Sequence, residues 1–205
     1  MSSERTVSDD ELLAQADNLR EEARTLLHEE GLLSIIKQVG PVCVIGSYAL
    51  NLMTWRDLDI SVQLPDENDI PGFYDIGHRI VEKFQVARMT FNNPVLLPSF
   101  PYDRGLYLGP HMLYRGQNWK VDLWGYGKDD YQMNLHKFEG LSNELRDEDR
   151  LSILRIKNEV CKRPEYIHEI TSIDIYKAVV KHHIKTVKEF DEWFKHKSER
   201  AEMQG

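Results

Sequence analysis

The order of apolar and polar residues first predicts a long helix. Apolar residues recur at helical spacing between residues 12 and 27, and they follow Ser8 and Glu11, whose spacing is that of a capping box. Gly31 interrupts this periodicity, and the apolar residues of 32–36 predict a second, short helix. We therefore expect the chain to begin with an amphipathic helix and a short helical continuation.

Two strands are predicted next. The β-branched run 42–45 predicts a buried strand that ends at Gly46. Over residues 57–63, apolar and polar side chains alternate strictly, which is typical of a strand with one face in the core. Asp57 and Asp59 lie on the polar face of that strand, so this face is the one available for chemistry.

The rest of the chain predicts a second strand-rich stretch and then helices. The pattern predicts a helix over 74–84 and a strand over 85–91, followed by a proline-containing loop over 92–105. The two strands of a hairpin are predicted over 106–115 and 119–126. The segment 116–118 is the predicted turn of that hairpin. Helical periodicity returns after Gly140, and its last part, over 173–194, predicts one long helix. These elements predict an α+β domain over 1–140, with its long N-terminal helix, and a helical C-terminal unit over 141–205.

The composition permits a folded core but gives little general attraction for polyanions. The chain has 205 residues, of which 41% are hydrophobic, enough for a substantial core. Its formal net charge is -8, so we do not expect the surface as a whole to attract a nucleic-acid backbone. A polyanion would have to bind at a local site.

Cysteine usage and the N-terminal residues bear on the compartment. Cys43 lies within an apolar run, where a buried, reduced thiol is expected, and Cys161 is the other cysteine of the sequence. The first residues are polar and no long apolar run follows them, so neither a signal peptide nor a membrane span is predicted. We expect a cytoplasmic protein, and the sequence is compatible with a homodimer.

The candidate chemistry is concentrated between residues 46 and 60. Asp57 and Asp59 occupy alternate positions of the predicted strand, roughly 6 to 7 Å apart along the backbone, so their oxygens can converge on shared divalent cations. The Gly46-Ser47 pair ends the preceding strand, where backbone amides can approach a phosphate and a hydroxyl can donate to it. The segment therefore predicts a magnesium cradle beside a phosphate site.

At these residues the sequence resembles the DNA polymerase beta type of nucleotidyltransferase superfamily, in which Gly-Ser is followed further along the chain by Asp-x-Asp. The segment 46–60 looks most similar to the small antibiotic-modifying adenylyltransferases that act on aminoglycosides or lincosamides. The resemblance spans roughly 42–124, and it implies a mixed sheet flanked by helices with a third carboxylate from a later strand. Asp122 matches that third carboxylate best, and Asp103 is its main rival.

The sequence departs from many members of that superfamily after the Gly-Ser pair. Tyr48, Ala49 and Leu50 stand where a small residue, an arginine and a glycine often follow. The charge of a triphosphate must then be balanced by other cations, and Arg56 and Lys120 are the candidates for this role.

The resemblance implies a magnesium-dependent nucleotidyltransferase. It would move a nucleoside monophosphate from a nucleoside triphosphate, with ATP as the default donor, to a hydroxyl of a small molecule, and it would release pyrophosphate. Two Mg²⁺ ions would be held by Asp57, Asp59 and Asp122 as the catalytic carboxylates, with Asp122 nearest the acceptor.

Two alternatives stay open. The first is a toxin-type enzyme that modifies a protein or a tRNA. Its support is a set of lysines on the predicted last helix: Lys177, Lys181, Lys185 and Lys188. A solvated helix face is the simpler explanation of these lysines. The second is a nucleotide-binding regulatory subunit without turnover.

The histidines and the aromatic residues add no further site. The eight histidines form no recognised zinc spacing. Core packing is the default interpretation of the aromatic residues, although some could stack on a base or sugar: Trp55, Trp119, Trp124 and the stretch 100–107.

Overall fold

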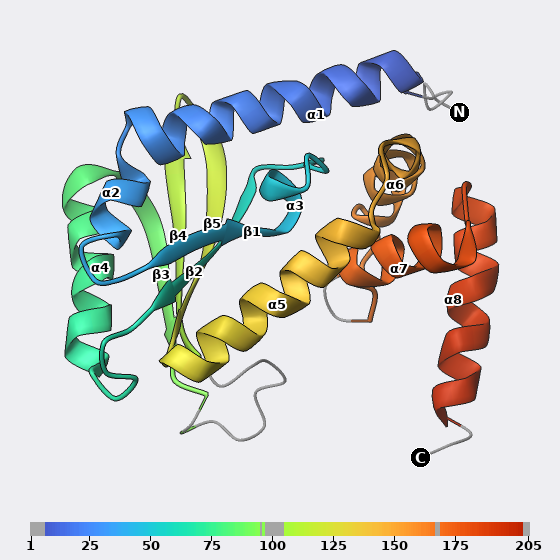
Figure 1. Cartoon of the computed structure of the whole chain (residues 1–205). Coiled ribbons are helices and arrows are strands. Elements are labelled where there is room, and N and C mark those ends of the chain that lie inside the picture. Colours follow the sequence, from blue (N-terminus) through green and yellow to red (C-terminus); the bar gives the residue numbers. More distant parts are fainter. Residues whose placement is uncertain (1–6, 95, 97–104, 167–168, 203–205) are drawn as a thin grey trace. The chain divides into compact units, whose positions relative to one another are not determined.

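The structure is a computed structural model that describes residues 7–94, 96, 105–166 and 169–202 (Figure 1). Its helices are α1 (Asp9–Arg24), α2 (Leu32–Ile36), α3 (Gly46–Ala49), α4 (Ile70–Lys83), α5 (Lys128–Glu144), α6 (Asp147–Val160), α7 (Ser172–His182) and α8 (Val187–Glu202). A π-helical turn, η1 (Thr25–Glu29), lies between α1 and α2. The strands are β1 (Val42–Ile45), β2 (Asp57–Gln63), β3 (Gln85–Asn92), β4 (Leu106–Tyr114) and β5 (Gln117–Tyr126).

The strands form one mixed sheet in the order β1-β2-β5-β4-β3. β2 and β5 are parallel, and the other neighbouring pairs are antiparallel. The predicted α+β class with a mixed sheet and flanking helices is therefore confirmed. The parallel pair at the centre of the sheet is the part that matters for the candidate site.

One face of the sheet carries the core. The apolar positions of β2 are fully buried, as are those of β5, and they join buried residues of η1, α2 and α4: Leu58, Ile60, Val62, Val121, Leu123, Leu26, Leu27, Leu32, Ile36 and Ile80. Because side chains alternate along a strand, the same pairing puts the polar residues of β2 and β5 on the opposite face. The predicted division of β2 into a core face and a polar face is confirmed for Leu58, Asp57 and Asp59, although Ser61 on the polar face is also buried.

The capping box predicted before the first helix is present at the beginning of α1. The backbone N–H of Ser8 donates to Glu11 Oε2 at 2.9 Å, and the N–H of Glu11 donates to Ser8 Oγ at 3.3 Å. Gly31 has a φ of 80° and precedes α2, so it breaks the helical run as predicted.

Three sequence predictions of elements were wrong. β1 is half-buried, because it lies at the edge of the sheet and pairs with β2 alone. The hairpin turns at Arg115 and Gly116, which have φ values of 51° and 72°, so β5 begins at Gln117 within the segment predicted as turn. The long helix predicted over 173–194 is two helices, because α7 ends at His182 and the next residue, His183, has a φ of 54°.

That helix break also separates the four lysines of the predicted last helix. Lys177 and Lys181 lie on α7, Lys188 lies on α8, and Lys185 lies between the two helices. Lys181 pairs with Glu144 at 3.4 Å. The lysines therefore do not form a continuous face of one helix.

The chain divides into two compact units. One contains Met1–Asp17 and Asn143–Gly205, and the other is Asn18–Ser142. In the first unit, α6, α7 and α8 bury Ile153, Leu154, Ile156, Val160, Ile175, Val179 and Phe190, and Arg150 pairs with Asp17 at 2.6 Å. The sheet and the candidate site belong to the second unit.

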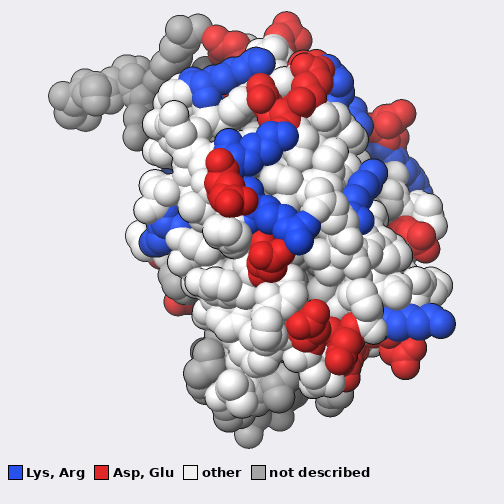
Figure 2. Space-filling model, turned by 90° about the vertical axis from the view of Figure 1, so that its left-hand side faces the viewer, with Lys and Arg blue, Asp and Glu red and all other residues white. Residues whose placement is uncertain are grey.

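Charged side chains of both signs are mixed on the side of the molecule that Figure 2 shows, which is the left of Figure 1. On α4, for example, Arg79 pairs with Asp75 at 2.6 Å. Such mixing is expected of a solvated surface and gives no broad attraction for a polyanion. No helix in the described part of the chain is long and apolar enough to cross a membrane.

Candidate active site

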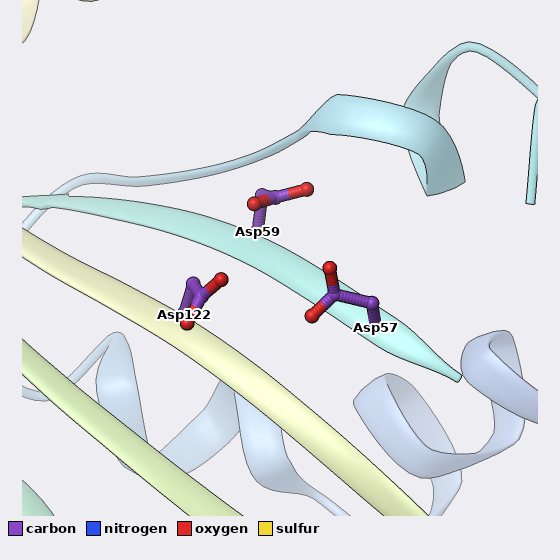
Figure 3. A group of neighbouring side chains, drawn as sticks. All are labelled: Asp57, Asp59 and Asp122. Carbon is purple, nitrogen blue, oxygen red and sulfur yellow. The ribbon is translucent and has the colours of Figure 1, made fainter. Parts of the chain in front are cut away.

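Three carboxylates meet on the polar face of the central parallel pair. Asp59 of β2 lies directly beside Asp122 of β5, and Asp57 precedes Asp59 by two residues on the same face. One oxygen from each side chain lies within 4.8 Å of the others. Figure 3 shows the three carboxylates on one side of the sheet and facing a common space. The structure thus brings together the three residues named from the sequence, and the rival Asp103 lies outside the described residues.

Gly46 lies directly against one of these carboxylates. Ile45 pairs with Asp59 at the end of β1, and Gly46 then turns the chain into α3 with a φ of 67°. A Cβ atom at Gly46 would lie 2.0 Å from Asp59 Oδ2, so only glycine leaves this carboxylate its place. The next residue, Ser47, is buried. The predicted Gly-Ser pair is therefore adjacent to the carboxylates.

Lys120 lies on β5, two residues before Asp122, and faces two of the carboxylates. Its Nζ lies 2.5 Å from Asp122 Oδ2 and 3.8 Å from Asp57 Oδ1. Burial by itself lowers the pKa of Lys120, but the charges of Asp57, Asp122 and Asp59 and the hydrogen bond to Asp122 outweigh it, so the pKa is raised. The ammonium group therefore stays protonated and offsets part of the repulsion among the carboxylates.

Tyr107 of β4 contacts Asp122, which the sequence did not predict. Its hydroxyl donates to Asp122 Oδ1 at 2.6 Å, so both oxygens of Asp122 are engaged. Burial raises the pKa of Tyr107, and the negative charge of Asp122 adds to the rise. A Cβ at Gly109 would lie 2.4 Å from Tyr107 Oη, so Gly109 leaves the room that the phenol needs to reach Asp122.

Arg56, the other cation proposed to balance the triphosphate, pairs with a carboxylate on α1. Its Nε and Nη2 donate to Glu22 at 2.8 and 3.0 Å. The described contacts of its guanidinium are thus with Glu22, and its assignment to a triphosphate stays a prediction.

Aromatic rings continue the polar face beyond Asp122. The ring of Trp124 lies 4.8 Å from that of Tyr107 and 6.2 Å from that of Tyr126, measured between centroids. Trp119, by contrast, is buried in the core, as the default interpretation expected.

Comparisons with known proteins concern the fold. No protein-family model and no curated protein matches the sequence. Among solved structures, the chain is similar to the Cid1 poly(U) polymerase bound to Mg and 3′-dATP, with a TM-score of 0.56, 14% identity, and coverage of 85% of this chain and 50% of that one.

Two further solved structures are similar. For the GLD-2/RNP-8 complex the TM-score is 0.55, the identity 13%, and the coverage 84% of this chain and 64% of that one. For a cytoplasmic RNA terminal U-transferase the TM-score is 0.53 and the identity is 18%, and the match covers 84% of this chain and 54% of that one. The chain spans about half to two thirds of the length of these proteins. The chain therefore shares its α+β fold with these solved structures.

Proposed function

We propose that this protein is a divalent-metal-dependent nucleotidyltransferase. The observation that carries the proposal is the convergence of Asp57, Asp59 and Asp122, whose ligand oxygens lie within 4.8 Å of one another in this fold. In the reaction, an acceptor hydroxyl oxygen bonds to the α-phosphorus of a nucleoside triphosphate. The bond from that phosphorus to its bridging oxygen breaks, pyrophosphate leaves with the electron pair, and the hydroxyl proton passes to water.

The residues fit a hard divalent cation such as Mg²⁺. All three donors are carboxylates, which this cation prefers, and the side chains of Asp57 and Asp122 are only 15% and 16% exposed. We assign the two ions to Asp57 and Asp59, with Asp122 as ligand of the ion nearest the acceptor. When bound, the metal would stabilise charge on the phosphates and lower the pKa of the acceptor hydroxyl.

The surrounding residues of the chain hold this arrangement. Gly46 keeps space for Asp59, and Tyr107 orients Asp122 through its hydroxyl. Lys120 is placed to balance charge among the carboxylates and on an incoming phosphate. Ser47, directly after Gly46, supplies a hydroxyl for the triphosphate.

Two kinds of acceptor are candidates. The motif resemblance favours a small hydroxyl-bearing molecule, as in the antibiotic adenylyltransferases. The similar solved proteins include, by their names, a poly(U) polymerase and an RNA terminal U-transferase, which supports an RNA end as a second candidate. Both acceptors use the same transfer step.

The test is transfer of label from each of the four α-labelled nucleoside triphosphates in the presence of Mg²⁺. A metabolite extract and a short RNA serve as separate acceptor sources, and Asp57→Asn and Asp59→Asn serve as variants of nearly unchanged size. Label should reach an acceptor with the unmutated protein and with neither variant. Absence of transfer and of pyrophosphate release with every nucleotide and acceptor would refute the catalytic proposal.

A further inference from the structure

A row of basic side chains crosses the sheet beside the three carboxylates. The strand register pairs Arg88 of β3 with His111 of β4, and His111 with Lys120 of β5. Lys120 in turn lies beside Asp57 of β2. Residues that pair directly across strands point to the same face. Arg88, His111 and Lys120, called here the basic row, therefore share the face of the carboxylates.

Two side chains of the basic row are in close contact. Arg88 Nη2 lies 2.6 Å from His111 Nε2. Neighbouring strands are roughly 4.8 Å apart, so the basic row extends about 10 Å from β5 to β3. Burial lowers the pKa of His111, and the positive charges of Arg88 and Lys120 lower it further. A neutral ring accepts from Arg88 Nη2 through Nε2, and an anion over the basic row would favour the protonated ring, which donates instead.

Two of these side chains are available to such an anion. Arg88 is exposed and His111 is half-buried. Among the described residues, neither forms a salt bridge with a carboxylate, whereas several other arginines do: Arg24, Arg56, Arg79, Arg150, Arg155 and Arg163. Arg88, at the outer end of the basic row, is thus an exposed cation with no carboxylate partner among the described residues.

The position of the basic row assigns it to one substrate. Gly46 and Ser47 lie on the β1 side of the carboxylates, where the proposed function puts the donor triphosphate. The basic row extends to the other side, over β4 and β3. The space on that side is the one left for the acceptor, since the hydroxyl must attack in line with the leaving pyrophosphate.

We propose that Arg88, His111 and Lys120 bind a phosphate group of the acceptor. This inference rests on the proposed function and narrows its acceptor to a phosphorylated compound, either a free nucleotide or the end of an oligonucleotide. The chain has a net charge of -8 and carries three carboxylates at this site, so a phosphorylated acceptor needs local cations there. A polycationic acceptor, such as an aminoglycoside, would instead meet like charge.

The first test is binding, because it does not require turnover. Adenosine, AMP and a hexa-adenylate RNA are titrated into the full chain with Mg²⁺ and a saturating α,β-methylene ATP analogue, which keeps the probes out of the donor site. Arg88→Ala should weaken the binding of the phosphorylated probes about tenfold, the loss of one charge-assisted hydrogen bond, and leave adenosine unchanged. The probe with the larger change identifies whether the phosphate belongs to a nucleotide or an oligonucleotide.

Two variants control for fold and net charge. Arg88→Lys keeps the charge and should keep most of the affinity. Arg79→Ala removes one positive charge from α4, where Arg79 pairs with Asp75, and should change no probe. Failure of both phosphorylated probes to bind the unmutated protein, or an equal loss for adenosine and AMP in Arg88→Ala, would overturn the inference.

The second test is turnover with the phosphorylated acceptor. Arg88→Ala should raise the KM of that acceptor about tenfold and leave the KM of the nucleoside triphosphate unchanged. A rise in the KM of the triphosphate instead would assign the basic row to the donor and overturn the inference. Lack of all transfer would count against the proposed function, while the binding result would still decide on the basic row.

Discussion

Gly46 is the position where one added methyl group should test the geometry of the carboxylates. Gly46→Ala has two costs. An L residue at a φ of 67° costs about 1–2 kcal/mol. In addition, the new Cβ would lie 2.0 Å from Asp59 Oδ2, whereas real Cβ contacts essentially never fall under 3.0 Å, so this carboxylate must move by about 1 Å. A displacement of that size at reacting groups lowers rates about 10²-fold.

Gly116→Ala separates the two costs. Gly116 has a φ of 72°, but a Cβ there would meet nothing within 4 Å. Both variants should therefore lose a few degrees of Tm, because each carries a similar backbone strain of about 1–2 kcal/mol. Thermal unfolding followed by circular dichroism measures this loss, and label transfer from an α-labelled nucleoside triphosphate measures activity.

Only Gly46→Ala should then lose about 10²-fold in transfer rate and bind Mn²⁺ more weakly. Equal activity of the two variants, at similar Tm, would refute the argument that the contact between Gly46 and Asp59 sets the geometry of the site.

Further predictions concern substitutions at Tyr107, Lys120 and Arg56. Tyr107→Phe removes the hydrogen bond to Asp122, so transfer should fall about 10- to 100-fold while the free energy of unfolding falls by only about 1 kcal/mol, measured by urea titration. Lys120→Met leaves the carboxylate repulsion unbalanced, so Mg²⁺ should raise the Tm of this variant by more than it raises that of the unmutated protein; an equal rise would contradict the role of Lys120. The pKa of Lys120 is raised in the fold, so its contribution to stability is complete below its ordinary pKa of 10.5 and is lost above it, and Lys120→Met should lack this part of the alkaline decline in Tm. Arg56→Ala breaks a partly exposed ion pair with Glu22, so it should lower the free energy of unfolding by less than about 1 kcal/mol, and a large rise in the KM of the triphosphate would show that Arg56 also reaches the donor.

Local patterns were sufficient to predict the carboxylates of β2. The alternation over Asp57–Gln63 and the spacing of Asp57 and Asp59 are properties of a few consecutive residues. The glycine against Asp59 was also visible in the sequence, since a glycine directly after a strand indicates a sharp turn or a close approach. These features depend on no distant part of the chain.

The contact of Tyr107 with Asp122 could not be predicted, because it depends on the register of β4 and β5. The predicted turn 116–118 implies that Arg115 pairs with Trp119, which would place Asp122 opposite the core residue Met112. The structure instead pairs Tyr114 with Gln117. The observed register differs from the predicted one by an odd number of residues. The residues of β4 therefore lie on the faces opposite to those predicted, and Tyr107 and His111 lie on the face of the site.

Long-range topology explains the remaining differences. An apolar β-branched run such as 42–45 is typical of a central strand, and only the strand order shows that β1 is at an edge. Arg88 reaches the site face through β3, at a point where the register shifts between Val86 and Arg88. A single sequence does not reveal such a shift.

The central claim is that Asp57, Asp59 and Asp122 together hold the metal of a nucleotidyl transfer. A crystal soaked with MnCl₂ and a non-hydrolysable nucleoside triphosphate tests it most directly, through the anomalous signal of the metal. Our account predicts a peak ligated by all three carboxylates and by the triphosphate. A peak elsewhere, or a site in which Asp122 does not ligate the metal, would contradict it.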